Sequence, residues 1–252
     1  MPVKFDLNGG VAIVTIDRPE ARNAIDGATA LAMSEAIQRI NSDRDIRVGV
    51  ITGAGGNFCA GMDLKAFLRK ELVRLPEVGF AGVTQAKIVK PLVAAVEGYA
   101  LAGGFEIALA CDIVVAAEDA KFGLSEVKRA LVANAGGLVR LPRQLPAKIA
   151  SELVLTGDIY PASVLAQHGL VNKLVPSGQA LESALEYARK IAANGPLAVA
   201  ASKRVMAESL DWRTTEMFDR QNEITAAVFA SADAREGAIA FAEKRAPVWC
   251  GE

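Results

Sequence analysis

The stretch "GYALAGGFEIALACD", residues 98–112, is almost wholly apolar, yet it carries the carboxylate of Glu106 three residues after Gly103. Burying a carboxylate is costly unless the group is neutralised, paired or hydrogen-bonded. If a helix begins at Gly103, its first amide groups have no partner within the helix. Glu106 then lies on the same face as Gly103, about 5–6 Å away.

This arrangement has two interpretations. In the first, Gly103-Gly104 is a simple turn, and Glu106 is favoured only by the positive end of the helix dipole. In the second, the Gly103 amide and the Glu106 carboxylate face one cavity. The amide then stabilises an oxyanion, and the carboxylate moves a proton at the neighbouring carbon atoms. This stretch alone leaves both interpretations open.

Strands and helices alternate around this stretch, which predicts an α/β fold built from crossover units. Strands are expected over residues 3–7, 11–17, 47–53, 91–98 and 112–117. Helices are expected over residues 28–43, near 82–88 and from residue 103 onward. Asn8-Gly9 predicts a hairpin turn between the first two strands. The helix over 28–43 is expected to bury Leu31, Ala36, Ile37 and Ile40.

The chain becomes helical beyond about residue 140. Helices are expected over residues 146–157, 161–169, 180–194, 196–210 and 214–231, with Pro161 and Pro196 at first helical positions. We therefore divide the chain into an α/β core, residues 1–190, and a C-terminal helical region, residues 191–252. Spare apolar faces on these helices predict a homo-oligomer, with the helical region serving oligomerisation and closure of the active site.

Composition excludes several classes of function. The 252 residues include 28 basic and 29 acidic side chains, a balance that favours neither nucleic acid nor an anionic membrane as partner. The apolar region 91–117 is interrupted by Glu97, Glu106 and Asp112, so no segment approaches the ~20 apolar residues of a membrane span. Three cysteines without CxxC spacing and an opening "MPVKFDLNGG" without an apolar signal core predict a cytoplasmic protein.

Few side chains other than carboxylates remain as candidates for proton transfer. His168 is the only histidine, and its place before Gly169 predicts the end of a helix, where a cation is favourable without any function. Cys59 has no histidine near it in sequence, which favours a buried small hydrophobe over a nucleophile. The sequence therefore predicts no metal site and no cysteine or serine nucleophile.

A second glycine-rich stretch, "GGNFCAGMDLKAF" at residues 55–67, predicts another tight turn from strand into helix. Its amides are candidates for a second oxyanion donor. A phosphate-binding loop is the rival interpretation, but neither GxGxxG nor GxxxxGK[ST] is present.

Taken together, several motifs resemble the enoyl-CoA hydratase (crotonase) family. They are "IDRPEARNAI", "GNFCAGMDLK", "KPLVAAVEGYALAGGFEIALACDIVVAAEDAKFGLSEV", "LTGDIYPASVLAQHGLVNKLV" and "REGAIAFAEKRAPVW". The resemblance covers nearly the whole chain, with the motifs in family-like order and spacing. It implies a crotonase-like fold of repeated ββα units with a C-terminal helical region, assembled as trimers or dimers of trimers.

The resemblance also implies the catalytic residues. The thioester oxygen would lie between the backbone amides of Met62 and Gly103, and two glutamates, Glu106 and Glu126, would flank the substrate. We assign Glu106 as the base toward water and Glu126 as the acid toward the α-carbon. Without the resemblance, Glu126 in "SEVKRAL" is typical of a solvated glutamate in a first helical turn.

The substrate implied is an acyl-CoA thioester, so that coenzyme A belongs to the substrate and no separate cofactor is needed. By motif position, the residues near it are Arg22, Ala24, Ala60, Asp63, Leu64, Lys65 and Gly104. Phe241 and Lys244 would approach the acyl group and the coenzyme of a neighbouring subunit. For the three basic residues of this set, solvated surface cations are the alternative.

The chain departs from the hydratase pattern after Glu126. Ala133-Asn134 stands where many hydratases have Pro-Gly, and "EVKRALVANAGGLVRLPR" is somewhat like carnitinyl-CoA dehydratase-type members. Residues 66–82 are expected to form a variable wall over the acyl chain. The leading hypothesis is an enoyl-CoA hydratase. The alternatives are an isomerase, a dehydratase of a specialised acyl-CoA, and a non-enzymatic acyl-CoA-binding homologue.

Overall fold

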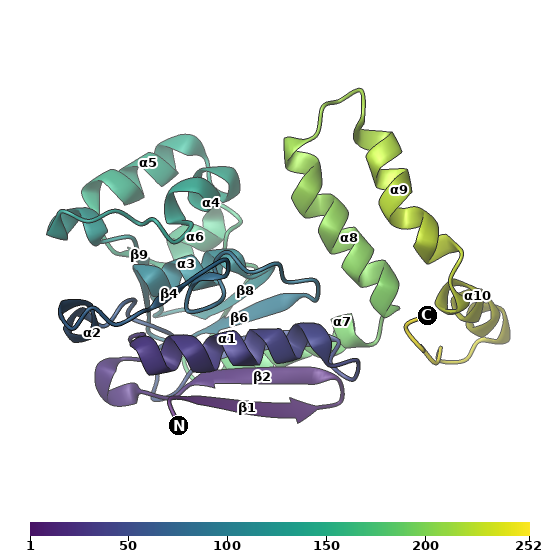
Figure 1. Ribbon diagram of the computed structural model, residues 1–252, viewed down its shortest axis with the longest axis horizontal. Coiled ribbons are helices and arrows are strands. Elements are labelled where there is room, and N and C mark those ends of the chain that lie inside the picture. Colours follow the sequence, from purple (N-terminus) through teal and green to yellow (C-terminus); the bar gives the residue numbers. More distant parts are fainter.

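A six-stranded sheet forms the centre of the protein in the computed structural model, which describes residues 1–252 (Figure 1). Its strands are β1 (Val3–Asn8), β2 (Val11–Ile16), β3 (Val48–Gly53), β6 (Leu92–Val96), β8 (Ile113–Ala117) and β11 (Lys173–Val175), in the order β1-β2-β3-β6-β8-β11. β1 pairs antiparallel with β2, and the other pairs are parallel. The parallel strands are continuous apolar runs because both faces of this sheet are covered.

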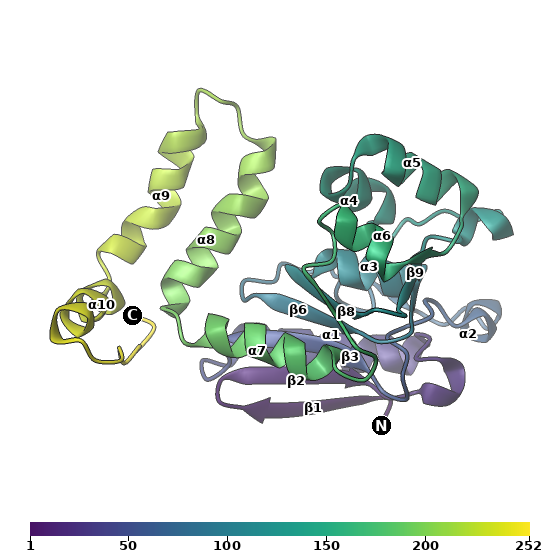
Figure 2. The ribbon, with the colours of Figure 1, turned by 180° about the vertical axis from the view of Figure 1, so that it is seen from behind.

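Two helices cover opposite faces of the central sheet (Figures 1 and 2). On one face, α1 (Gly27–Ser42) buries Met33, Ile37 and Ile40 in the main core. On the other face, α7 (Ala180–Ala192) packs Ala180, Ala184 and Ala188 against valines of the sheet. Small side chains on α7 let the helix approach the sheet closely.

A second, smaller sheet gives the fold its repeated ββα units. β7 (Tyr99–Leu101) follows β6, and β9 (Lys121–Gly123) follows β8, while β10 (Tyr160–Pro161) completes the order β10-β9-β7. The short helix α3 (Gly103–Ala110) follows β7. After β9 come the 3-10 turn η2 (Glu126–Arg129) and the helices α4 (Gly137–Gln144), α5 (Ala147–Thr156) and α6 (Ala162–Gln167). The crotonase-like fold expected from the resemblance is therefore present.

The last three helices extend away from the sheet. α8 (Pro196–Glu208) and α9 (Met217–Phe229), joined by η3 (Ser209–Asp211), form a hairpin, and α10 (Ala232–Glu243) lies at the opposite end of the molecule from α2 (Leu64–Leu68) (Figures 1 and 2). Lys203 Nζ ties α8 to the core by donating to Asp112 Oδ2 (2.7 Å) and to the Lys90 carbonyl (2.9 Å). Trp249 Nε1 donates to the Ala193 carbonyl (2.8 Å) and returns the chain end toward the α7–α8 junction.

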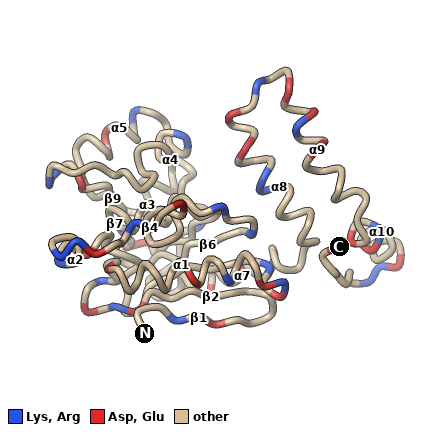
Figure 3. Tube along the Cα trace, viewed as in Figure 1, with Lys and Arg blue, Asp and Glu red and all other residues tan.

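Charge is distributed without a dominant sign along the chain. Residues of both signs are scattered along the chain, and no element gathers a large cluster of one sign (Figure 3). None of the helices combines the length and the apolar character that crossing a bilayer demands.

Most expected elements are confirmed, and the exceptions have local causes. The hairpin loop is Gly9-Gly10 rather than Asn8-Gly9, because Asn8 pairs with Val11 and the two glycines supply the positive φ angles (57° and 80°) of the turn. Leu31 is 56% exposed, and Met33, a half-turn along the helix, takes its place in the core. Pro161 directly precedes α6 rather than opening it.

The helix expected near residues 82–88 is wrong. This segment is a series of turns after the small hairpin of β4 (Arg74–Leu75) and β5 (Gly79–Phe80). Gly79, Ala81 and Gly82 have positive φ angles (76°, 54° and 66°), which an α-helix does not accommodate. Gly82 is required there, because a Cβ atom would collide with Ser34 of α1. The apolar residues of 82–88, such as Val83, pack into the main core from these turns and do not form a helix.

Replacement of Asp26 tests the start of α1. The Asp26 carboxylate accepts from the Thr29 amide (2.8 Å) and from Thr29 Oγ1 (2.7 Å), and it pairs with Arg18 Nη2 (3.2 Å). Asp26→Ala is expected to lower the free energy of unfolding by about 1–2 kcal/mol, because an N-cap is lost. Asp26→Asn keeps the acceptor and is expected to lose less than half of that. Urea denaturation of both variants measures the difference, and equal losses would refute the N-cap role.

Candidate active site

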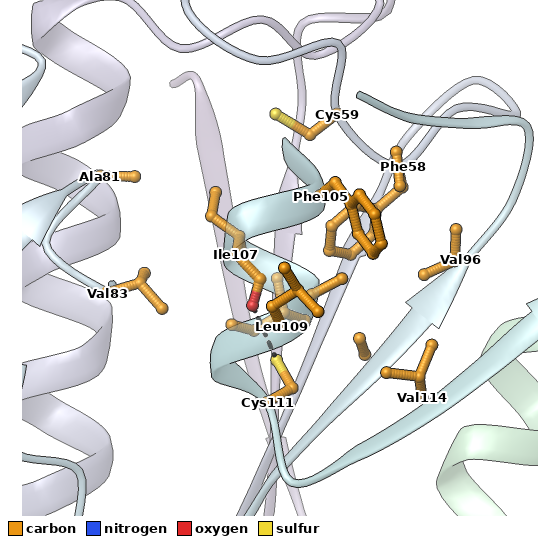
Figure 4. Close-up of a cluster of buried hydrophobic side chains, with 14 of the residues drawn as sticks. Phe58, Cys59, Ala81, Val83, Val96, Phe105, Ile107, Leu109, Cys111 and Val114 are labelled. Carbon is orange, nitrogen blue, oxygen red and sulfur yellow. Dashed lines mark hydrogen bonds between the residues drawn. The ribbon is translucent and has the colours of Figure 1, made fainter. Parts of the chain in front are cut away.

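Two chain turns meet at the N-terminus of α3. Cys59 N donates to the Tyr99 carbonyl (2.9 Å), and Leu101 N donates to the Cys59 carbonyl (3.0 Å). These hydrogen bonds fix residues 59–62 beside the end of β7. Gly104 allows the close approach, since a Cβ atom on it would collide with the Cys59 carbonyl. Behind the turn, Phe105 lies beside Phe58 and anchors α3 in the core (Figure 4).

The amides of Met62 and Gly103 are the two donors expected from the sequence. Ile25 N donates to the Gly61 carbonyl (2.8 Å) and Asp63 N donates to the Ile25 carbonyl (2.9 Å), so the Met62 amide between them has no backbone acceptor. Gly103 is the first residue of α3, and its amide likewise has none. A Cβ atom on Gly61 would lie 3.1 Å from the Gly103 nitrogen, so the two turns are in contact. The structure thus brings both free amides to one place.

Glu106 is buried at the first turn of α3, with 3% of its surface exposed. Its Oε1 accepts from the Gly137 amide at the start of α4 (2.8 Å). The pKa of Glu106 is raised to about 7, chiefly by burial and in smaller part by the charge of Glu126. The amides of Gly137 and Ala135 and the charge of Arg140 act in the opposite direction. A carboxyl group with this pKa exchanges protons readily at neutral pH.

Glu126 opens η2, and its charge acts on Glu106. Its Oε2 is buried without a hydrogen-bond partner in the protein. Burial raises the pKa of Glu126, against the lowering effect of its own backbone amide and of Arg129. The interpretation of Glu126 as an ordinary solvated surface glutamate is therefore wrong. The pair consists of two carboxyl groups in one site, which is an arrangement that can hold one ionised and one protonated group.

The residues expected near the coenzyme fall into two groups around this site. Arg22 lies beside Ala60, whose amide donates to the Arg22 carbonyl (3.0 Å), and its guanidinium lies 5.6 Å from the centre of the Tyr99 ring. Ala24 is buried one residue before Ile25, which pairs with the Met62 turn. Leu64 and Lys65 begin α2 and are exposed. These residues border the amide pair.

Two others of the expected set have structural tasks. The Asp63 carboxylate accepts from the amides of Lys65 (2.9 Å) and Ala66 (3.3 Å) and so caps α2, and it also pairs with Arg18 Nη2 (3.1 Å). Gly104 provides the close approach described above. Asp63 thus caps α2 and Gly104 permits close packing, and contact of either residue with the coenzyme stays a prediction.

Phe241 and Lys244 lie far from the carboxylate pair within one chain. Both belong to the end of α10, where Phe241 is 87% exposed and Lys244 adopts a left-handed conformation. The structure of a single chain therefore does not bring them to the site (Figures 1 and 2). Their expected contact was with a neighbouring subunit, and it stays a prediction.

Cys59 and His168 have the structural positions expected of them. Cys59 is fully buried, and burial raises the pKa of its thiol to about 12, which leaves it an unreactive thiol at neutral pH. His168 follows the last residue of α6, as the C-cap. The Cys59 thiol has its hydrogen-bond partner in Gly61, and Glu106 has its partner in Gly137.

Sequence reasoning missed the residues that hold the site together. Arg18 Nη2 bridges Asp26 and Asp63, and the buried side chain of Asn23 donates to the carbonyls of Ala54 (2.8 Å) and Asn57 (2.6 Å). Gly137 binds Glu106 across 31 residues of chain. Arg18 and Asn23 stand within the quoted motif "IDRPEARNAI", but their partners are distant in sequence, so no local pattern assigns these contacts.

Comparison with known proteins identifies the family of the chain. The family model "Enoyl-CoA hydratase/isomerase" matches residues 6–252. The chain is 47% identical to the enoyl-CoA hydratase EchA19 of Mycobacterium tuberculosis over 249 residues, 96% of this chain and 94% of the relative. It is 43% identical to the carnitinyl-CoA dehydratase of Salmonella typhi over 255 residues, 97% of this chain and 96% of the relative.

A solved structure extends the likeness to three dimensions. The crystal structure of the enoyl-CoA hydratase EchA1 from Mycobacterium marinum superposes with a TM-score of 0.98 at 51% identity, and covers 100% of this chain and 99% of that one. Motifs, fold and comparisons lead to one conclusion. The chain belongs to the enoyl-CoA hydratase/isomerase family.

Proposed function

We propose that the protein adds water reversibly across the 2,3 double bond of a 2-enoyl-CoA thioester, using Glu106 and Glu126 as its proton-transfer pair. The observation that carries this proposal is the buried Glu106, which is subject to the charge of Glu126 and follows the turn of two backbone amides without acceptors. An isomerase or a non-enzymatic binding protein has less need of two carboxyl groups in one apolar site. Family membership supports the acyl-CoA thioester as substrate.

In the proposed reaction one glutamate is ionised and accepts a proton, while the other is protonated and donates one. Ionised Glu106 takes a proton from water as the water oxygen bonds to C3, and the electrons of the double bond move toward the thioester oxygen. The amides of Met62 and Gly103 receive the enolate charge, and one such donor is typically worth ~3–4 kcal/mol. Protonated Glu126, whose Oε2 is free of protein partners, delivers its proton to C2.

A dehydratase of a polar acyl-CoA is the second candidate. Two observations favour it: the Ala133-Asn134 segment, and the 43% identity to a carnitinyl-CoA dehydratase. Ala133 is buried and Asn134 is exposed between Glu126 and the Gly137 amide that binds Glu106. The segment therefore lies where it can shape the acyl site. Assays with crotonyl-CoA and with a trimethylammonium-bearing enoyl-CoA, run side by side, separate the two.

The glutamate pair is tested by Glu106→Gln and Glu126→Gln. Each variant is expected to lower kcat for crotonyl-CoA hydration by about 10²–10⁴-fold, because one proton-transfer group is lost. Binding of a saturated CoA thioester is expected to change less than threefold. Loss of the enoyl absorbance measures the rate, and Glu118→Gln, an exposed glutamate without side-chain partners, serves as control. Near-wild-type rates in both site variants would contradict the mechanism.

Burial of Glu106 also makes the free energy of unfolding depend on pH. Its pKa of about 7 in the folded chain exceeds the ordinary 4.5, so folding favours the protonated form. The stabilisation is complete below pH 4.5 and is lost as pH rises through about 7. Glu106→Gln, which stays neutral, is thus expected to gain up to about 3 kcal/mol over wild type between pH 5 and pH 8. Thermal unfolding at both pH values measures this, and a pH-independent difference would contradict it.

We also propose a homo-oligomer of three or six chains. The C-terminal helices expose large apolar side chains, namely Met206, Leu210, Phe218, Phe229 and Phe241. A mostly apolar groove of about 790 Å³ separates α8 and α9 from the core. Exposed apolar surface of this extent favours association. The proposal would also let Phe241 and Lys244 reach the site of a neighbouring chain.

Light scattering after size exclusion tests the assembly. The expected mass is three or six times the 26.5 kDa of one chain. Phe229→Asp is expected to shift the protein toward single chains, because a charge replaces an apolar contact. Leu31→Asp, at an exposed apolar position on α1, is the matched control and is expected to leave the mass unchanged. A wild-type mass of one chain would overturn the oligomer.

A further inference from the structure

Arg140 connects the two halves of the active site, although neither the motifs nor the proposed reaction assigns it a task. It lies in the first turn of α4, where its amide donates to the Gly136 carbonyl (2.8 Å). Gly137, the first residue of α4, donates its amide to Glu106 Oε1 (2.8 Å). Arg140 is therefore built into the same helical turn that binds the buried carboxyl group.

The guanidinium of Arg140 reaches to the other half of the site. Its Nη2 donates to the Thr84 carbonyl (2.6 Å). Thr84 is buried, and its Oγ1 accepts from the Phe80 amide (3.0 Å). The Phe80 ring lies against Gly103, where a Cβ atom would be 2.6 Å from Cζ. A continuous set of contacts thus runs from Glu106 through α4, Arg140, Thr84 and Phe80 to Gly103.

We propose that Arg140 is a positioning residue for the reaction: anchored on the Thr84 carbonyl, it fixes the first turn of α4 around Glu106 and holds a permanent positive charge beside that carboxyl group. The inference rests on the proposed role of Glu106. An arginine suits the task because its guanidinium stays protonated when partly buried. A lysine in its place would keep the charge and one donor.

The electrostatics agree with this geometry. The Arg140 charge lowers the pKa of Glu106, against the larger effect of burial, and burial lowers the pKa of Arg140 itself. The other groups that face Glu106 are Glu126 from η2 and the amides of Gly137 and Ala135. Arg140 faces Glu106 and Cys111 from α3, and it shares the groove beneath α8 with Asp112 and Lys203, which pair with each other. Among these groups that shift the pKa of Glu106, Arg140 is the one that carries a positive charge.

The test compares Arg140→Met, Arg140→Gln and Arg140→Lys by infrared titration of the Glu106 carboxyl band, which is assigned by its loss in Glu106→Gln. The titration midpoint is expected to rise in the Met and Gln variants and to stay near that of wild type in the Lys variant. In parallel, kcat/KM for crotonyl-CoA at pH 6 is expected to fall about three- to tenfold in the Met and Gln variants, mainly through kcat. Arg143→Met, one turn along α4 and paired on the surface with Asp211, is the control.

Two results would overturn the inference: a midpoint in Arg140→Gln equal to that of wild type, or a shift in Arg140→Lys as large as in the Met and Gln variants. If Arg140→Met does not fold, the Gln and Lys variants decide the question alone. A fully active Glu106→Gln would overturn the proposed function. An inactive Glu106→Gln, together with a wild-type titration midpoint of Glu106 in Arg140→Gln, would overturn only the role of Arg140.

Discussion

The site depends on one local constraint, the pairing of Cys59 with Tyr99 and Leu101 through two backbone hydrogen bonds. This pairing joins the turn after β3 to the turn after β7, so the amides of Met62 and Gly103, which have no backbone acceptors, come from distant parts of the chain into neighbouring turns. The close approach is possible because Gly61 and Gly104 have no side chains to intervene. Backbone donors held in this way need no reorganisation when charge develops on a bound oxygen. Both donors belong to the main chain, while the Met62 side chain packs against the main core.

Next to these turns the protein buries the carboxyl group of Glu106, which is unfavourable for its ionised form. Glu106 lies in an otherwise apolar helix, and only the amides of Gly137 and Ala135 and the charge of Arg140 favour its ionised form. These groups come from the segment that follows Glu126. The same segment therefore supplies the second carboxyl group and controls the first. Its departure from the usual Pro-Gly pattern at Ala133-Asn134 makes it the natural place for differences in substrate to arise.

The sequence predicts the elements that carry the site better than the contacts that shape it. β3, β6, β8 and α3 could be predicted because each is an apolar run bounded by glycine or a charged residue. Glu126 could be selected only through the family resemblance, since its neighbours are typical of a solvated turn. Arg18, Asn23 and Arg140 act on partners far away in the chain, which periodicity cannot reveal. The segment near residue 82 was predicted as a helix because apolar spacing carries no information on φ angles.

The parallel order of the central sheet has a consequence for how the protein matures. Strands β3, β6 and β8 pair only with partners separated by long crossovers, so each of these pairings closes a large loop before it is stabilised. The two amides and two glutamates sit on successive crossovers of that sheet. The complete constellation therefore requires that these crossovers are folded together. Recovery of turnover during refolding should lag behind recovery of helical signal, which makes enzymatic activity a stringent reporter of finished tertiary structure.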